Sequence, residues 1–349
     1  MTHTAVTQTA TNETPTTFRG PARPRMGAAA GAVASLALAA VLAPPAAHAQ
    51  VDAPADPVLT NEEAPPAGDR DTLWDRTNFS LTTRATFHLP ADLDTDGDVG
   101  ISRLTGELGV SSLLGNDVFL RLSFGSEFSF YDFDDATGLV ANGDPFDTTY
   151  QYDINMALSG RFNPKWGWFT GGGLTWAAES GSSGSDIFRA RGFGGVRYTF
   201  NNDLSIGAGV GVFTRLEDDE LIIPLVTLDW KLGPRSQLET GGLGGAGGVG
   251  VRYTFKPTRQ WDLFGQARWV GREYRLDDDG PIPEGVARDQ RFEVAAGARY
   301  NFTPNIQVHG RAGVDFFNEI ELLDRTGDQI SSEDVDPSVV LGIGVTIRF

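Results

Sequence analysis

The chain has 349 residues, no cysteine, 43 glycines and a formal net charge of −18. The lack of cysteine excludes a disulfide framework, a thiolate metal site, a cysteine nucleophile and a lipid-modified N-terminal cysteine. The acidic balance argues against nucleic acid as a partner, because phosphate backbones bind basic surfaces. The mean hydropathy of −0.20 does not separate a soluble protein from a membrane barrel, whose strands alternate apolar and polar residues.

The N-terminal region has the three parts of a secretory signal peptide. Three arginines precede an uninterrupted run of small apolar residues, Gly27–Leu42, and an Ala-His-Ala triplet follows at residues 47–49. This arrangement predicts a signal peptide over residues 1–49, cleaved before Gln50. A transmembrane helix is the alternative, but the apolar run is short and rich in alanine and glycine.

Residues 50–75 follow the expected cleavage site and are rich in Pro, Ala, Asp and Glu, without helical or strand periodicity. This composition predicts a disordered leader on the periplasmic side. Cleavage removes three arginines and Glu13, which leaves 25 basic and 45 acidic residues and a net charge of −20.

From residue 76 to the end of the chain, apolar and polar residues alternate with a period of two. In one segment Val118, Phe124 and Phe130 share one parity, and Arg121 and Glu127 share the other. Successive strand side chains point to opposite faces, so each segment predicts a strand with one apolar and one polar face. Fourteen such segments follow one another: near 76–89, 98–110, 116–131, 148–162, 165–177, 186–200, 203–216, 219–232, 235–241, 247–256, 260–275, 288–302, 305–320 and 335–349.

Most of these segments exceed the roughly 9–11 residues that a tilted strand needs to cross a bilayer. We therefore predict an all-β fold, an antiparallel transmembrane β-barrel of about fourteen strands over residues 76–349. The weakest pair is 235–241 with 247–256, because the link between them is nearly all glycine; one irregular hairpin there would leave twelve strands. Pro224 is a second irregularity, since proline removes a backbone donor from a strand pair.

The polar faces carry arginine and carboxylate residues, whereas many apolar faces end in aromatic residues. Apolar faces toward lipid and polar faces toward an enclosed lumen are typical of a membrane barrel, which must close because every backbone group needs a partner. A secreted β-sandwich, with its apolar faces packed together, is the alternative. The predicted lumen-lining residues are Arg84, Arg121, Arg161, Arg189, Arg191, Arg197, Arg215, Arg252, Arg268, Arg291, Arg299, Arg311, Glu127, Asp153, Glu293 and Asp315.

Three segments end in the sequence Arg-Tyr-x-Phe, at residues 197–200, 252–255 and 299–302, each just before a short turn. The connections at the other ends of the strands are mostly longer and acidic. This asymmetry is typical of bacterial barrels, with the short turns and both termini on the periplasmic side. The final segment ends in Val345–Phe349.

With the signal peptide, these features resemble the outer-membrane β-barrel proteins of Gram-negative bacteria, most closely uncharacterised members. The resemblance implies a location in the bacterial outer membrane, in contact with lipid and lipopolysaccharide. It also implies that the C-terminal strand is recognised by the barrel-assembly machinery.

The mature chain offers little for catalysis or metal binding. His88 and His309 have inward parity but are expected near opposite ends of the barrel, so we predict no catalytic residue and no enzyme activity. Asp92, Asp94 and Asp96 match the front half of a calcium loop, but Arg103 stands where the closing glutamate would be. They are the candidate ligands for Ca²⁺, and no other cofactor is predicted.

These observations predict a passive channel or small-solute transporter with an arginine-lined lumen that favours anions. The alternative is a non-conducting structural or surface-binding barrel, in which ion pairs fill the lumen and the acidic loops contact divalent cations or lipopolysaccharide. The sequence leaves the solute and the oligomeric state open.

Overall fold

The computed structural model describes residues 77–349, apart from residues 116, 142, 183–185 and 242–248. The predicted signal peptide and leader lie outside the described residues. Within the described part, no helix is long and apolar enough to cross a membrane.

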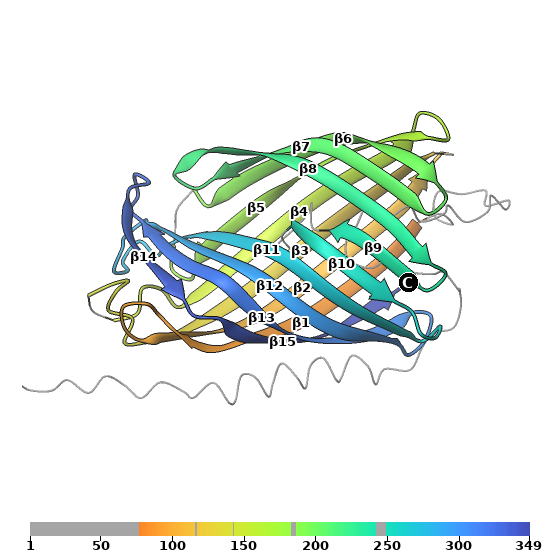
Figure 1. Ribbon diagram of the computed structural model, residues 1–349. Coiled ribbons are helices and arrows are strands. Elements are labelled where there is room, and N and C mark those ends of the chain that lie inside the picture. Colours follow the sequence, from red (N-terminus) through yellow and green to blue (C-terminus); the bar gives the residue numbers. More distant parts are fainter. Residues whose placement is uncertain (1–76, 116, 142, 183–185, 242–248) are drawn as a thin grey trace, which may run out of the picture.

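The described residues form fifteen strands, which Figure 1 shows in chain order. Their bounds are β1 Thr77–Asp92, β2 Asp98–Leu114, β3 Val118–Asp134, β4 Thr148–Arg161, β5 Trp166–Glu179, β6 Phe188–Asn201, β7 Leu204–Arg215, β8 Asp218–Gly233, β9 Ser236–Gly241, β10 Val249–Phe255, β11 Trp261–Arg275, β12 Val286–Asn301, β13 Ile306–Leu323, β14 Gln329–Val335 and β15 Ser338–Arg348.

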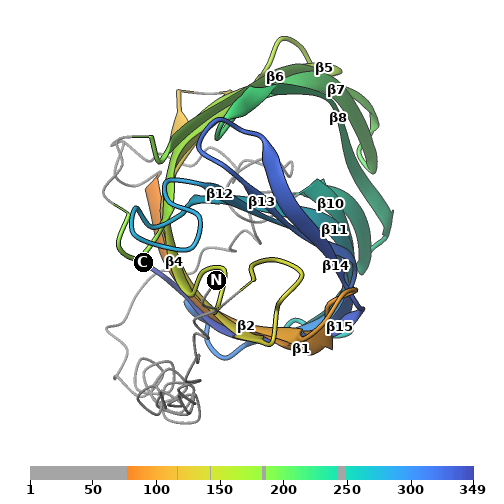
Figure 2. The same cartoon turned by 90° about the vertical axis from the view of Figure 1, so that its left-hand side faces the viewer.

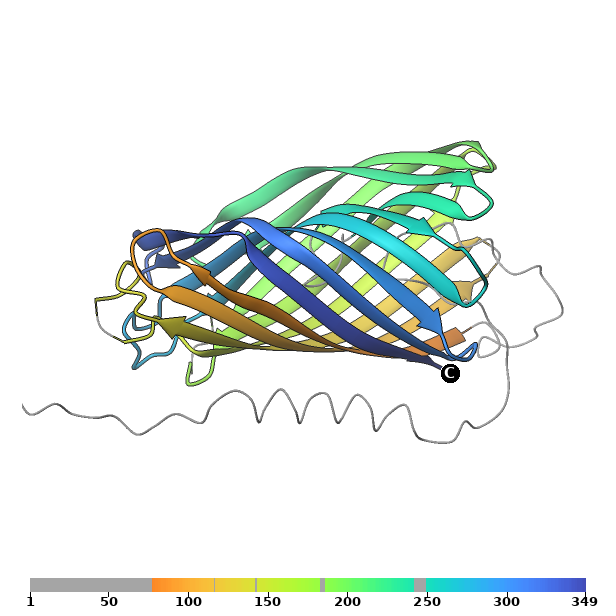
Figure 3. The same ribbon diagram turned by 60° about the horizontal axis from the view of Figure 1, so that its bottom comes forward.

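Fourteen of these strands form a closed antiparallel barrel, as predicted. Each of β1–β13 pairs with the next strand in sequence, β13 also pairs with β15, and β15 pairs with β1. Figure 3 shows β15, in dark blue, between β13 and β1. The extra strand, β14, pairs with the end of β13 and extends one hairpin beyond the ring.

The barrel wall exposes its apolar residues and encloses its polar residues. On β3, Phe124 is 46% exposed and Phe130 is 40% exposed, whereas Glu127 and Ser129 are buried. This is the arrangement expected of a wall that faces acyl chains outside and polar groups inside. The alternative of a β-sandwich is wrong, because the strands form one ring and no second sheet covers the apolar rows.

One end of the barrel, here called the short-turn end, carries tight connections and aromatic pairs. Trp166 packs against Tyr198 with ring centroids 4.9 Å apart, and Tyr198 packs against Phe200 at 4.8 Å. Tyr300 repeats this contact with Phe302 at 6.4 Å. Tyrosine and phenylalanine two residues apart share a face, so each Arg-Tyr-x-Phe segment contributes outward rings at one rim.

The opposite, long-loop end is narrower, because β5 and β11 meet there. Ala178 of β5 pairs in parallel with Arg275 of β11, beyond the points where β5 leaves β6 and β11 leaves β10. Strands β1–β5, β11–β13 and β15 therefore enclose a narrow section at this end. Figure 2, a view of this end, shows β6–β8 beside the narrow section; these three strands are here called the β6–β8 lobe.

Within the described residues, Pro224 lies in a part of β8 that pairs only with β7. β8 pairs with β9 from Asp229 to Gly233, whereas its pairing with β7 begins at Asp218. Among the described residues no strand pairs with Pro224 on the β9 side, and proline is tolerated at such an edge because it donates no backbone hydrogen bond. β9 and β10 are short, yet both belong to the ring, so the count is fourteen rather than twelve.

A β-bulge changes the inward face of β13. Phe317 has a φ of 49°, and the register with β12 shifts next to it. On the short-turn side of this residue the inward residues are odd-numbered, such as Asp315; beyond it Asn318 and Ile320 are buried instead. A bulge inserts one residue, so the period-two pattern reverses across it.

Candidate functional site

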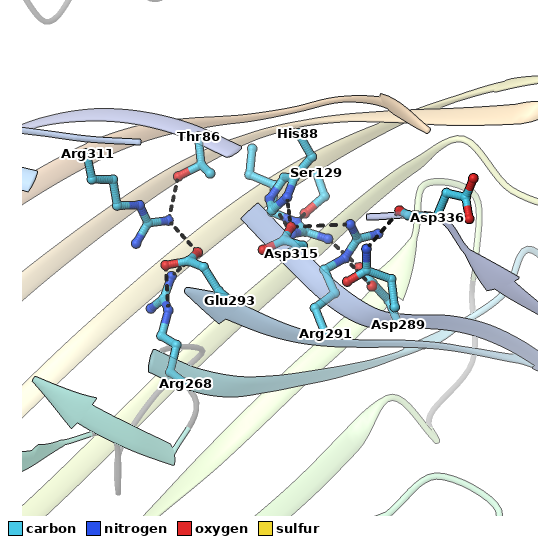
Figure 4. A network of polar contacts seen from close by, with 12 residues as sticks. Thr86, His88, Ser129, Arg268, Asp289, Arg291, Glu293, Arg311, Asp315 and Asp336 are labelled. Atoms are coloured by element: carbon cyan, nitrogen blue, oxygen red, sulfur yellow. Dashed lines mark hydrogen bonds and ion pairs between the residues drawn. The ribbon is translucent and has the colours of Figure 1, made fainter. Parts of the chain in front are cut away.

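The barrel interior is the candidate site, and its charged residues lie in layers along the barrel axis. The first layer is centred on Glu293 of β12, which is buried. Its carboxylate accepts hydrogen bonds from Arg268 at 2.9 Å and Gln266 at 2.6 Å, and lies 3.2 Å from the guanidinium of Arg311. Figure 4 shows Arg268 and Arg311 approaching Glu293 from two different strands.

The second layer is an ion-pair network formed by His88, Arg103, Asp289, Arg291 and Asp315, all buried. The Nδ1 of His88 lies 2.5 Å from Asp315, and its Nε2 lies 3.0 Å from Arg103. Arg103 also pairs with Asp289, which accepts a hydrogen bond from Arg291 at 2.6 Å. Figure 4 shows His88, Asp289, Arg291 and Asp315 converging inside the barrel.

A third contact crosses the lumen from β3 to β11. Arg272 donates two hydrogen bonds to Glu127, at 2.6 and 3.1 Å, and both side chains are buried. A bidentate arginine–carboxylate pair fixes the positions of both groups as well as stabilising them. The pair therefore ties opposite walls of the narrow section together.

Above these layers, apolar side chains fill the mouth of the narrow section. Tyr131 and Phe133 of β3 pack against Phe146, which comes from the loop between β3 and β4, at 4.6 and 5.2 Å between ring centroids. Tyr274 of β11 lies 6.3 Å from Tyr131 on the other side. Leu276 and other buried residues of the loop ends complete this cluster. The narrow section is thus closed toward the long-loop end.

The short-turn end holds a cavity, here called the arginine chamber, with about 890 Å³ of space including open solvent. Its lining has one carboxylate, Glu107, and these six arginines: Arg84, Arg121, Arg252, Arg299, Arg311 and Arg348. Arg252 and Arg299 lie 5.1 and 5.9 Å from the ring centroid of Phe264, close enough for cation–π attraction. Three of the six arginines also meet carboxylates: Arg121 meets Glu107 at 3.4 Å, Arg299 meets Asp262 at 3.8 Å and Arg311 meets Glu293 at 3.2 Å. The lining is thus rich in arginine, with part of its charge compensated.

The predicted lumen residues lie in different parts of the structure. Arg84, Arg121, Arg252, Arg299 and Arg311 line the arginine chamber, and Glu127, Arg268, Arg291, Glu293 and Asp315 belong to the layers. Arg191 pairs with Asp153 at 3.3 Å, and Arg197 on β6 is attracted by the charge of Asp229. Arg161 is exposed at the short-turn rim, and Arg189 and Arg215 contact Glu273 at 3.3 and 3.1 Å.

Arg189 and Arg215 attach the β6–β8 lobe to the outside of the narrow section. Arg272 points into the lumen, so its neighbour Glu273 lies on the outer face of β11, where both arginines contact it. The backbone N–H of Leu216 also donates to Glu273, at 3.1 Å, and Arg288 of β12 bonds the same carboxylate. Glu273 thus joins the β6–β8 lobe to the narrow section at the long-loop end.

Among the charged residues of the layers, Arg103, Arg272 and Asp289 were not predicted from the sequence. Arg272 and Asp289 have the parity of predicted residues on their own strands, since Arg272 follows Arg268 by four positions and Asp289 precedes Arg291 by two. The period-two signal could have found these two.

The histidines have different surroundings. His88 contacts a partner through each ring nitrogen, so no nitrogen is left to act as a catalytic base. His309 lines the arginine chamber instead.

The acidic hairpin between β1 and β2 contains the candidate calcium ligands Asp92, Asp94 and Asp96. Asp96 accepts a hydrogen bond from the N–H of Gly97 at 3.0 Å, and the N–H of Asp94 donates to the carbonyl of Asp334. Among the described residues, no group of three histidine or acidic side chains is arranged to hold a metal ion. The calcium site remains a prediction.

Comparisons with known proteins concern the architecture. No protein-family model matches the sequence, and a search of curated proteins finds no match. Similar solved structures include a TodX monoaromatic hydrocarbon channel mutant (TM-score 0.42, 10% identity, covering 78% of this chain and 90% of that one). Others are the KdgM porin with disordered oligogalacturonate (0.34, 10%, 77% and 99%) and the NanC porin (0.33, 12%, 76% and 98%).

Proposed function

We propose that the chain is a bacterial outer-membrane channel that passes small anionic solutes. The signal peptide at residues 1–49 would direct its export, and the C-terminal strand would be handed to the barrel-assembly machinery. The arginine chamber is the observation that carries the proposal, since six arginines and one glutamate line it. Cationic rings in a pore favour anions.

The solute path that we propose runs beside the filled narrow section, along the inner face of β5–β7. The inward positions there include six glycines, Gly171, Gly173, Gly195, Gly207, Gly209 and Gly211. A Cβ at Gly195 would stand 2.4 Å from the ring of Phe169, and one at Gly171 would stand 2.5 Å from Phe193. Both rings therefore lie along the wall, which keeps them out of the lumen.

Single-channel recording in planar bilayers tests this function. The purified barrel should give discrete conductance steps, and its reversal potential in a KCl gradient should show anion preference. The double variant Arg84→Glu/Arg348→Glu should weaken or invert that preference, because both residues line the chamber. Arg325→Glu is the matched control, since Arg325 is exposed in the loop before β14. Absence of conductance at all voltages, or equal selectivity in all three proteins, would refute the proposal.

The filled narrow section favours a second candidate, a structural barrel whose acidic loops bind divalent cations or lipopolysaccharide at the cell surface. The triple variant D277N/D278N/D279N tests it, because these residues follow β11 at the long-loop end. Leakage of a hydrophobic dye through the envelope, with conductance unchanged, would favour this role. Intact envelopes would exclude it.

A further inference from the structure

The exposed charges of the short-turn end are mostly basic. Six exposed basic residues lie in the short connections or within three residues of them, and are here called the basic rim: Arg161, Lys165, Lys231, Arg235, Lys256 and Arg259. Among the described residues, the exposed acidic residues in such positions are Asp117 and Asp203. All three lysines of the chain belong to the basic rim. The long-loop connections carry mostly aspartate and glutamate, so the two ends of the barrel expose opposite charge.

In the described part of the chain, no ion pair joins the basic rim to a carboxylate. The interior arginines differ, since Arg272, for example, lies 2.6 Å from Glu127. The guanidinium of Arg235 instead donates to the backbone carbonyl of Pro257 at 3.2 Å, which leaves its charge uncompensated. The charge of the basic rim is therefore available to an anion outside the barrel.

Four residues of the basic rim lie on two adjacent turns. Lys231 and Arg235 flank the β8–β9 turn, and Lys256 and Arg259 belong to the β10–β11 turn. The backbone N–H of Lys256 donates to the carbonyl of Arg235 at 2.8 Å, which holds the two turns together. Neighbouring strands are about 4.8 Å apart, so these turns are centred about 10 Å apart. Long side chains from both turns can therefore approach one phosphate group.

The tryptophan residues of the short-turn end place the basic rim at the level of lipid headgroups. Trp166, Trp230 and Trp261 each lie within two positions of a basic-rim residue, at the end of a strand. They are 44, 42 and 43% exposed on the outer face of the wall. Tryptophan is enriched at membrane–water interfaces, where its ring meets acyl chains and its N–H meets headgroups. A lysine or arginine beside it extends its charge to the level of the phosphates.

We propose that the basic rim binds the phosphate groups of anionic phospholipids in the leaflet that borders the short turns. The strongest site lies over the β8–β9 and β10–β11 turns, and Arg161 with Lys165 forms a second site. A soluble anion meets the same charges but lacks acyl chains to lie against the apolar wall, so a lipid gains from both contacts. In the orientation proposed above, this leaflet is the periplasmic one. The binding needs no open lumen and goes beyond the proposed channel function.

Native mass spectrometry of the purified, delipidated barrel measures this binding. The barrel is titrated at low salt with phosphatidylglycerol or with phosphatidylcholine of the same acyl chains. We expect the first phosphatidylglycerol to bind at least about tenfold more tightly than the first phosphatidylcholine. At least two basic-rim residues would reach each headgroup, and a lysine or arginine near the membrane surface contributes roughly a fivefold gain.

Three variants make the result decisive. The neutral variant R161Q/K165Q/K231Q/K256Q/R259Q retains Arg235 and its contact with Pro257, and its preference should fall below about threefold. The charge-keeping variant R161K/K165R/K231R/K256R/R259K has the same number of substitutions and should retain the preference. Arg325→Gln removes an exposed charge from the long-loop end and should have no effect. Heat-modifiable electrophoresis shows that each variant is folded before it is titrated.

Equal affinity of the unaltered barrel for the two lipids would overturn the proposal, and so would an unchanged preference in the neutral variant. If inorganic phosphate binds as tightly as phosphatidylglycerol, the basic rim is a site for free anions instead. If isolated peptidoglycan captures the barrel through the basic rim while the lipid preference is absent, the partner is the cell wall and the proposal is wrong. A barrel that never conducts leaves every one of these outcomes unchanged.

Discussion

The contact between Glu127 and Arg272 gives the sharpest test of how the interior holds the barrel together. The pair joins β3 to β11 across the lumen, 145 positions apart in sequence, through bonds of 2.6 and 3.1 Å. Its side chains are only 5% and 9% exposed. Glu127→Gln keeps the shape of the side chain but leaves Arg272 buried without its counter-charge.

Removing one partner of a buried ion pair costs about 3–5 kcal/mol, because the remaining charge stays out of water. We expect Glu127→Gln to lower the free energy of unfolding by about that amount, and Arg272→Gln to do the same. The double variant E127M/R272M should recover most of the loss, because apolar residues of similar volume need no counter-charge. In a cycle built from E127M, R272M and the double variant, the coupling energy should then be at least about 3 kcal/mol.

The matched control is the pair formed by Glu107 and Arg121 on adjacent strands. These groups are 3.4 Å apart, with side chains 34% and 17% exposed, so their contact is solvated. Glu107→Gln should cost at most about 1 kcal/mol. The assay is equilibrium unfolding in urea from lipid vesicles, followed by tryptophan fluorescence. If Glu127→Gln is as mild as Glu107→Gln, Arg272 is hydrated in the folded barrel, and the reasoning from a dry interior is wrong.

Three further predictions concern the wall, the assembly signal and the lobe contact. Gly195→Ala should destabilise the barrel by about 1–3 kcal/mol and reduce single-channel conductance, because its Cβ would meet a phenylalanine ring and a backbone oxygen at 2.4 Å. Gly192→Ala is the control and should change neither stability nor conductance, because a Cβ there would meet no atom within 4 Å. Deleting Phe349 should lower the amount of barrel in the outer membrane, measured by heat-modifiable electrophoresis of membrane fractions, whereas Phe302→Ala at the same rim should not. Glu273→Gln should loosen the β6–β8 lobe, detected as faster amide hydrogen exchange at Leu216, while the exchange of β1–β4 stays unchanged.

The sequence predicts the ring of strands well, because the period-two pattern is local and each strand buries its own polar face. It does not predict β14, whose residues become a strand because β13 extends beyond the rim and offers a free edge. Nor does it predict the contact between β5 and β11, which joins segments 97 positions apart through a single parallel pair. Such non-local closure leaves no trace in the alternation of either strand.

The interior was predicted less completely than the wall, for two physical reasons. Parity fixes which face a side chain occupies but not what lies opposite, so Arg189 and Arg215 have inward parity and yet meet the outer face of β11. The bulge at Phe317 also reverses the parity of β13, which places Asn318 and Ile320 inside. The leader and the signal peptide remain predictions, since neither lies among the described residues.

The distribution of charge along the axis indicates which part of the lumen holds water. Where the interior is tightly filled, arginines such as Arg272 and Arg291 have carboxylates within hydrogen-bonding distance, because a lone buried charge would be too unstable. In the arginine chamber six arginines and one glutamate line the wall, and Asp262 and Glu293 add carboxylates within 3.8 and 3.2 Å of Arg299 and Arg311. The positive charge that remains is tolerated best in a medium of high dielectric constant, where like charges repel weakly. We therefore expect the chamber to be the solvated part of the interior, where a free anion gains most from binding.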